Sequence, residues 1–170
     1  MDIRTGELPT NTYDLVSCRA LLHQIAEYAP DVLTKMAAAV KPGGWLLVQE
    51  PDFHLAPITG PDAWATTWKG LIEWGHSNGI DWLMGRKLPS MVQAVGFGHP
   101  EAKTDVQNIR GRDRGALYFQ LFFAEVRDRV IEAGQLDGRT VDSASALLDD
   151  PSYWTQCWMM TAAWVRKPLA

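Results

Sequence analysis

Two acidic residues and a histidine follow one strongly apolar segment of the chain, and these side-chain types can transfer protons. Glu50 ends the run WLLVQE at residues 45–50, and Asp52 and His54 come directly after it. A carboxylate or imidazole at the carboxyl end of a buried strand can act as a general acid or base, because ligands bind at that end. Glu50, Asp52 and His54 are therefore candidate catalytic residues, and each also has a purely structural interpretation.

His23 lies in a second segment, LLHQI, at residues 21–25. It is a plausible base, although a packed or solvated histidine explains it equally well. No cluster of His, Cys, Asp and Glu has the spacing of a metal site, so the sequence predicts no bound metal. The four tryptophans Trp64, Trp68, Trp74 and Trp82 could line an apolar pocket, but core packing is the simpler use for most of them.

The charge balance argues against nucleic acid as a partner. Asp and Glu number 20 against 16 Lys and Arg, which gives a net charge of −4, and phosphate binding needs clustered cations. The arginines Arg110, Arg112 and Arg114 are most simply part of a solvated loop.

The length of 170 residues is that of one ordinary domain or of part of a larger one. Hydrophobic residues make up 46% and charged residues 21%, as in soluble globular proteins. No apolar run is long enough to span a bilayer, and residues 1–11 lack the features of a signal peptide. The two cysteines, Cys18 and Cys157, do not make a disulfide framework. These features predict a cytoplasmic protein.

Residues 13–50 must position the candidate residues, and their pattern predicts a strand, a helix and a second strand. YDLVS at residues 13–17 is a short apolar run, and Pro30 suits the first turn of a helix that continues through Val40. Lys41-Pro42-Gly43-Gly44 stops that helix. The continuous apolar run 45–50 is typical of a strand buried on both faces of a parallel sheet.

The rest of the chain shows mostly helical patterns. We expect helices over residues 61–77, 81–95, 115–133 and 139–149, each with apolar residues at helical spacing or a polar helical composition. Residues 101–110 alternate weakly and could form a strand, and residues 154–165 also favour a strand. There is no internal repeat.

Residues 13–53 resemble the second half of the class I S-adenosylmethionine-dependent methyltransferases. Those domains commonly carry a DLV strand, a short Leu-Leu-His-type helix, a helix ending in Lys-Pro-Gly-Gly and an apolar strand ending in an acidic residue. All four features occur here, in YDLVSCRALLHQI and VLTKMAAAVKPGGWLLVQEPDF. Residues 2–9, DIRTGELP, look like the family's GD…LP segment, of whose Gly-Asp pair only Asp2 is present. The resemblance is good over residues 2–53 and looser over residues 54–170.

The resemblance implies an α/β fold, an incomplete Rossmann-like methyltransferase sheet containing the later strands, with added helices. It also implies S-adenosyl-L-methionine as cofactor. Asp2 would accept a hydrogen bond from the adenine amino group, and Ile3 would offer its backbone N–H to the ring. Ser17, Cys18 and Arg19 would lie near the methionine end, and His23 could contact the cofactor or the substrate. Residues 54–150 would include a helical insertion on the substrate side.

One departure from the family concerns its glycine-rich loop after the first strand, which has no counterpart here. The acidic residue that holds the ribose hydroxyls is also missing. At ~30 residues per βαβ unit, the missing part amounts to on the order of 60–80 residues. We therefore expect a single methyltransferase-like domain, residues 1–170, that is truncated at its N-terminus. The DLV strand would then be a free sheet edge, open to a second copy or a partner chain.

Three hypotheses about function follow. The chain is a methyltransferase, or a portion of one, that acts on a small or lipid-like molecule. Alternatively, it is a non-catalytic relic of such an enzyme. In the third hypothesis it is an interaction module that docks on a partner through its exposed edge strand.

Overall fold

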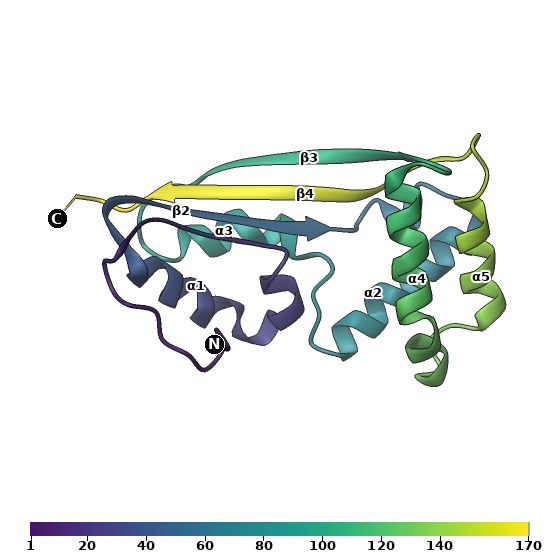
Figure 1. Ribbon diagram of the computed structural model, residues 1–170, viewed down its shortest axis with the longest axis horizontal. Helices are drawn as coiled ribbons and strands as arrows, with labels where there is room; N and C mark the ends of the chain where they lie inside the picture. Colours follow the sequence, from purple (N-terminus) through teal and green to yellow (C-terminus); the bar gives the residue numbers. More distant parts are fainter. Residues whose placement is uncertain (170) are drawn as a thin grey trace. The chain divides into compact units, whose positions relative to one another are not determined.

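The computed structural model describes residues 1–169, and these contain a four-stranded sheet with the order β1-β2-β4-β3 (Figure 1). The strands are β1 Tyr13–Arg19, β2 Val40–Asp52, β3 Glu101–Arg110 and β4 Trp154–Arg166. β1 pairs with β2 in parallel. The mixed α/β fold class is confirmed, and so are strands at all four expected places.

The helices divide into longer α-helices and short 3-10 turns. The α-helices are α1 Ala29–Ala39, α2 Asp62–Ser77, α3 Leu88–Gln93, α4 Arg114–Glu132 and α5 Gly138–Leu147. The 3-10 segments are η1 Leu22–Tyr28, η2 Ala56–Ile58 and η3 Met84–Lys87. The helix expected over residues 81–95 is thus shorter and broken in two. The structure begins it only at Met84, and the Asp81 backbone N–H before it donates to the His23 carbonyl oxygen at 2.7 Å.

The chain forms two compact units. The first, called the sheet unit here, consists of Met1–Asp52, Gly79–Asp105 and the C-terminal segment from Met160. The second, called the helical unit, consists of Phe53–Asn78 and Val106–Met159. Each unit contains parts of β3 and β4, so the chain passes between the units more than once.

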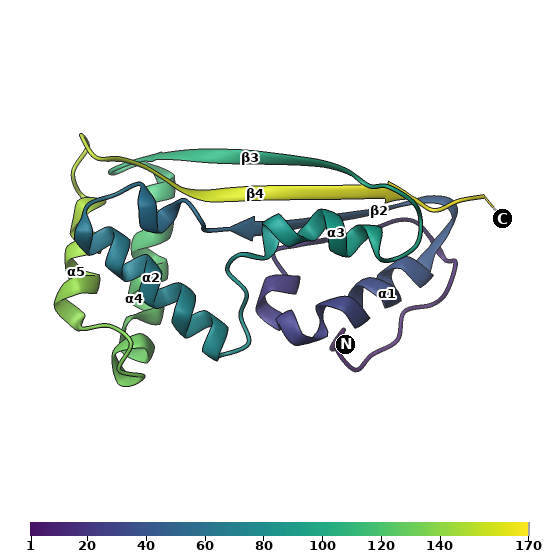
Figure 2. The same ribbon diagram turned by 180° about the vertical axis from the view of Figure 1, so that it is seen from behind.

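In the sheet unit, α1 and α3 lie along the same side of β2 in both views (Figures 1 and 2). The core forms between these helices and the sheet. Its members are fully or nearly fully buried and include Leu22, Val32, Leu33, Met36, Leu46, Val48, Leu88, Val92, Ala163 and Val165. Val16 and Cys18 of β1 pack against this cluster.

The opposite face of β2 is only partly covered, and this corrects the expectation of a strand buried on both faces. Leu46, Val48 and Glu50 are fully buried, whereas Trp45 is 40% exposed and Leu47 and Gln49 are half-buried. Burial alternates along β2 because successive side chains point to opposite faces of the sheet, and α1 and α3 cover only one of these faces.

The turn between α1 and β2 follows the sequence closely. α1 ends at Ala39, and Val40 already has extended backbone angles. Tyr13 is paired with Val40 but Leu15 with Trp45, so the residues from Lys41 to Gly44 form an irregularity in the ladder. Gly43 has φ +77°, a left-handed conformation that glycine adopts without strain. The Lys-Pro-Gly-Gly stop is therefore confirmed.

The helical unit has an aromatic core. Trp64 and Trp68 of α2 are fully buried, as is Phe119 of α4, and Phe53 stacks on Trp68 with ring centroids 4.8 Å apart. α4 and α5 begin at aspartate caps, Asp113 and Asp137, whose side chains accept backbone N–H groups. Trp82 lies in the sheet unit, so the four tryptophans do not form one stripe.

Candidate functional site

The carboxyl ends of β1 and β2 lie side by side in the sheet unit. Cys18 is paired with Val48 and Arg19 with Gln49. The chain then turns away at Ala20, whose φ is +50° and whose backbone N–H donates to the Gln49 carbonyl oxygen at 2.9 Å. In an open α/β sheet, ligands bind outside such strand ends.

Glu50 anchors the loop that follows β1. Its Oε1 accepts the backbone N–H of Leu21 at 3.0 Å and of Leu22 at 2.8 Å, and its Oε2 accepts that of His23 at 3.2 Å. The side chain is fully buried, so these donors replace its hydration. Glu50 thereby caps η1, which has no capping side chain of its own at Leu21.

His23 completes the set of donors around Glu50. Its Nδ1 lies 2.8 Å from Glu50 Oε2, and its residue exposure is only 4%. The imidazole ring lies beside the indole of Trp82, with centroids 5.5 Å apart. The His23 carbonyl oxygen accepts the Asp81 N–H at 2.7 Å, so the segment 79–82 packs on η1.

A hollow of about 480 Å³ runs along β1. Its lining is mainly apolar, and it includes three of the residues predicted to bind the cofactor, Ile3, Ser17 and Cys18. The remaining lining residues are Leu8, Tyr13, Leu15, Val16, Leu21 and Met36. Such a lining suits a flat or thin apolar group and supplies few charged contacts.

The N-terminal segment forms one wall of this hollow and is tied to α1 by Lys35. The Lys35 ammonium donates to the carbonyl oxygens of Ile3, Arg4 and Gly6 at 3.3, 2.9 and 3.1 Å. These contacts hold Ile3 in place although it lies close to the start of the chain.

Asp2 has an ionic partner within the same segment. Its carboxylate accepts the Arg4 backbone N–H at 2.9 Å and the Arg4 guanidinium at 2.7 Å. The Arg4 side chain holds the pKa of Asp2 down to about 2. The carboxylate is therefore ionised at neutral pH and can accept further hydrogen bonds, as adenine recognition would require.

Cys18 has the opposite character. Burial, together with the smaller effect of the nearby Glu50 carboxylate, raises the pKa of its thiol from 9.0 to about 12. The thiol is therefore protonated at neutral pH. Cys18 can line the hollow, but it cannot serve as a nucleophile there.

Asp52 fixes a different segment. Its carboxylate accepts Nε and Nη2 of Arg86, both at 2.8 Å, and the Arg86 backbone N–H at 3.1 Å. This bidentate contact raises the pKa of Arg86. Asp52 is 1% exposed, and the neighbouring Gly85 packs so tightly that a Cβ there would lie 2.9 Å from Asp52 Cβ.

The structure thus brings some of the predicted residues together and separates others. Ile3, Ser17 and Cys18 share the hollow, and Asp2 precedes Ile3. Arg19 ends β1 on the surface, and His23 is not among the lining residues. His54 is exposed and belongs to the helical unit.

Several residues of this region escaped sequence reasoning. Lys35, Gly85 and Arg86 position the segments around the site, and Trp82 packs on His23. Lys35 looks like an ordinary helix-surface lysine, and Arg86 is 34 residues from Asp52. No local pattern could have identified these contacts.

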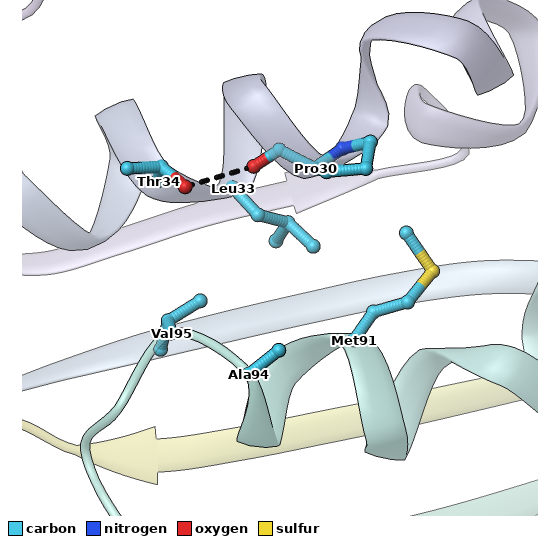
Figure 3. A pocket seen from close by; sticks show the side chains of 6 residues that line it. All are labelled: Pro30, Leu33, Thr34, Met91, Ala94 and Val95. Carbon is cyan, nitrogen blue, oxygen red and sulfur yellow. Dashed lines mark hydrogen bonds between the residues drawn. The ribbon is translucent and has the colours of Figure 1, made fainter.

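A second cavity, of about 320 Å³, lies between α1 and α3. In Figure 3, Leu33 points from α1 toward α3, and Met91 points back toward α1. Pro30, Thr34, Ala94 and Val95 complete the lining. The Thr34 hydroxyl donates to the Pro30 carbonyl oxygen at 3.0 Å, and none of the six lining residues is charged. This groove therefore offers no group for acid–base chemistry.

Within residues 1–169, no cluster of His, Cys, Asp and Glu could hold a metal ion. None of the helices in that part of the chain is sufficiently long and apolar to cross a membrane.

Comparison with known proteins identifies the family. Residues 2–98 match the family model described as a methyltransferase domain. This match covers more than half of the chain, and the chain belongs to the methyltransferase-domain family. No curated protein matches it.

Solved structures show the same fold. A methyltransferase-class protein of Bacillus halodurans is 17% identical, with a TM-score of 0.57 over 99% of this chain and 70% of its own. Phosphoethanolamine N-methyltransferase 2 of Haemonchus contortus, solved with S-adenosyl-L-methionine, is 17% identical, with a TM-score of 0.51. The present chain is covered to 98% and spans 36% of that enzyme's length. At these identities the likeness shows the fold alone.

Proposed function

We propose that the chain forms part of an S-adenosylmethionine-dependent methyltransferase that acts on a small or lipid-like molecule. The observation that carries this proposal is the hollow along β1, in which Ile3, Ser17 and Cys18 come together beside the carboxyl end of the strand. These three residues are ones that the family resemblance assigns to the cofactor.

The residues present fit one side of S-adenosylmethionine. The apolar lining suits the adenine ring, the Asp2 carboxylate is an ionised acceptor for its amino group, and Ser17 offers a hydroxyl. When bound, the cofactor would supply an electrophilic methyl group. The contribution of this chain is to hold and orient, which can lower a reaction barrier substantially without a dedicated catalytic group.

The family's glycine-rich loop has no counterpart in this sequence. We propose that it comes from outside these 170 residues, either in a longer chain or in a second polypeptide. The cytoplasmic location and the substrate-side role of residues 54–150 stay predictions.

A second candidate function is supported by the free edge of the sheet. β1 is the terminal strand in the order β1-β2-β4-β3, and its Tyr13 and Leu15 are 43% and 56% exposed. An apolar strand edge is a template for another strand. A docking module or a non-catalytic relic would use this edge without binding cofactor.

Titration calorimetry with S-adenosylhomocysteine distinguishes these functions. We expect saturable micromolar binding to the folded chain. Ser17→Trp should abolish it, because Ser17 is an exposed lining residue and an indole there would fill the hollow. Ser90→Trp, at an exposed position of α3 outside that lining, is the matched control and should bind normally.

The absence of heat from a folded sample would contradict autonomous cofactor binding and favour the docking module. If Ser17→Trp and Ser90→Trp bind S-adenosylhomocysteine equally well, the cofactor does not occupy the hollow along β1.

A further inference from the structure

A third hollow, of about 370 Å³, has all of its described lining residues in the helical unit. They are Thr59 after η2, Asn108 of β3, and Trp154, Thr155 and Gln156 at the start of β4. β3 and β4 are neighbours in the sheet and run side by side in both views (Figures 1 and 2). Each of these residues carries a hydrogen-bonding group, and none of them is charged. The other two hollows are mainly apolar, so this lining suits a different kind of ligand.

Two exposed side-chain amides pair with each other in this lining. Gln156 Nε2 donates to Asn108 Oδ1 at 2.8 Å, and both residues are exposed. In the described part of the chain neither amide makes another hydrogen bond, so the Asn108 NH₂ group and the Gln156 side-chain oxygen are available. If both amides were turned over, the free donor and the free acceptor would only change places. The pair therefore offers a donor and an acceptor side by side in either orientation.

Two threonine hydroxyls connect the segment after η2 to β4. Thr59 Oγ1 lies 2.9 Å from the carbonyl oxygens of both Leu55 and Gln156. It also lies 3.2 Å from Thr155 Oγ1. A hydroxyl has one proton, so when Thr59 donates to either carbonyl oxygen, Thr155 is the donor between the two threonines. These bonds fix both side chains before a ligand binds, which reduces the entropy lost on binding.

Trp154 adds an open aromatic surface to the polar groups. The residue is 59% exposed, and the central guanidinium carbon of Arg110 lies 5.8 Å from the ring centroid. This cation–π contact steadies the exposed indole. The face of an aromatic ring is electron-rich, so it attracts the polarised C–H groups of a saturated, hydroxylated ring.

The chemistry of the lining selects the ligand. An apolar molecule would leave the two amides without partners, which is unfavourable, and the uncharged lining favours a neutral ligand. A pair of adjacent hydroxyls matches the amide pair in either orientation, because each hydroxyl both donates and accepts. The volume is near the lower limit for small-molecule sites, which span about 300–1,000 Å³, so a single six-membered ring has a suitable size.

We propose that this hollow binds a neutral sugar ring. The C–H face of the sugar lies on Trp154, and two adjacent hydroxyls bond to Asn108 and Gln156. Binding requires neither S-adenosylmethionine nor methyl transfer, so the inference goes beyond the proposed function. If glycosides bind but S-adenosylhomocysteine does not, the proposed function fails and the sugar site stands.

Saturation-transfer difference NMR on the full chain tests the site, with the methyl glycosides of glucose, galactose and mannose as probes. We expect at least one of them to bind with a dissociation constant on the order of 1 mM, as suits a ligand of this size on an exposed site. The ring C–H protons that contact Trp154 should receive the most saturation. If a folded sample transfers no saturation to any of the three glycosides, the proposal is wrong.

Two variants locate the binding. Trp154→Ala removes the aromatic surface, and Asn108→Leu removes an amide while keeping a side chain of similar shape. Each should weaken binding at least about tenfold, because a stacked ring or a hydrogen-bond partner is lost. Unchanged affinity in Asn108→Leu would overturn the proposal, and this variant leaves Trp154 in place if Trp154→Ala fails to fold.

Trp45→Ala is the matched control. Trp45 is 40% exposed and also has an arginine over its ring, Arg166 at 5.9 Å, but it belongs to the sheet unit and does not line this hollow. This variant should bind glycosides normally. If it loses as much affinity as Trp154→Ala, the sugar stacks on any exposed tryptophan and there is no specific site.

A flat aromatic probe separates a sugar site from a site for planar rings. 9-Methyladenine can stack on an indole and bond to amides, but it has no hydroxyl groups. We expect it to bind more weakly than the best glycoside. Tighter binding of 9-methyladenine that is lost in Trp154→Ala would overturn the proposal in favour of a planar ligand.

Discussion

Glu50 shows how much chemistry one buried carboxylate can organise. Its two oxygens accept the backbone N–H groups of Leu21, Leu22 and His23 and face the His23 ring. Sequence reasoning selected Glu50 because it ends an apolar run. It could not reveal the partners, because three of them are backbone groups that carry no residue-specific signal. The same limitation applies to Lys35, whose acceptors are carbonyl oxygens.

Cys18 gives a prediction at the residue scale. Its thiol has a pKa of about 12 in the folded protein against 9.0 for an ordinary cysteine. At pH 8 the folded state should therefore alkylate more than about 100-fold more slowly at Cys18 than the urea-unfolded chain, since a pKa unit is a factor of ten in thiolate. Iodoacetamide labelling with peptide mapping measures this ratio.

The sign of the linkage follows from the same shift. The folded state holds the Cys18 proton more tightly, so its contribution to stability is complete below about pH 9 and is lost as the pH rises toward 12. In Cys18→Ala this decline in the free energy of unfolding should be smaller. Equal alkylation rates in folded and unfolded samples would contradict the burial of the thiol.

At the scale of elements, the sequence predicted best where local rules act alone. The Lys-Pro-Gly-Gly stop and the long helix at Arg114–Glu132 depend mainly on neighbouring residues. The prediction failed for the burial of β2, whose continuous apolar run implies cover on both faces. Whether a second layer is present is a tertiary property, and no local pattern encodes it.

η3 illustrates such a tertiary constraint and gives a prediction. A Cβ on Gly85 would lie 2.9 Å from Asp52 Cβ and 3.0 Å from the Glu50 carbonyl oxygen. Gly85→Ala should therefore push η3 away from β2 and weaken the Asp52–Arg86 contact. We expect a loss of about 1–3 kcal/mol in the free energy of unfolding, which is typical of overpacking.

Urea unfolding monitored by tryptophan fluorescence measures this loss. Ser90→Ala, at an exposed position of α3, is the control and should change the free energy by less than about 0.5 kcal/mol. A Gly85→Ala protein as stable as the control would show that β2 and η3 are not in tight contact.

At the scale of the whole molecule, the free edge of β1 is the feature with the clearest physical consequence. Tyr13 and Leu15 expose apolar surface there, and an edge strand without lysine or proline invites pairing. We expect the isolated chain to associate with increasing concentration, as measured by sedimentation velocity.

Leu15→Lys should reduce this association, because a charged lysine on an edge strand opposes pairing with another strand. Leu121→Lys replaces a leucine of α4 that is 63% exposed and should leave the association unchanged if the β1 edge is responsible. A monomer at all concentrations would contradict the prediction.

The division of the chain also affects how it is made. The sheet unit contains the first 52 residues, yet β4, the strand between β2 and β3, ends at Arg166. A ribosome must therefore produce nearly the whole polypeptide before the two early strands and β3 can join one sheet. Contacts between distant segments slow folding. During synthesis, β1 and β2 therefore form only part of the sheet until β4 has been made, and chaperones that bind apolar strands would act on this incomplete sheet.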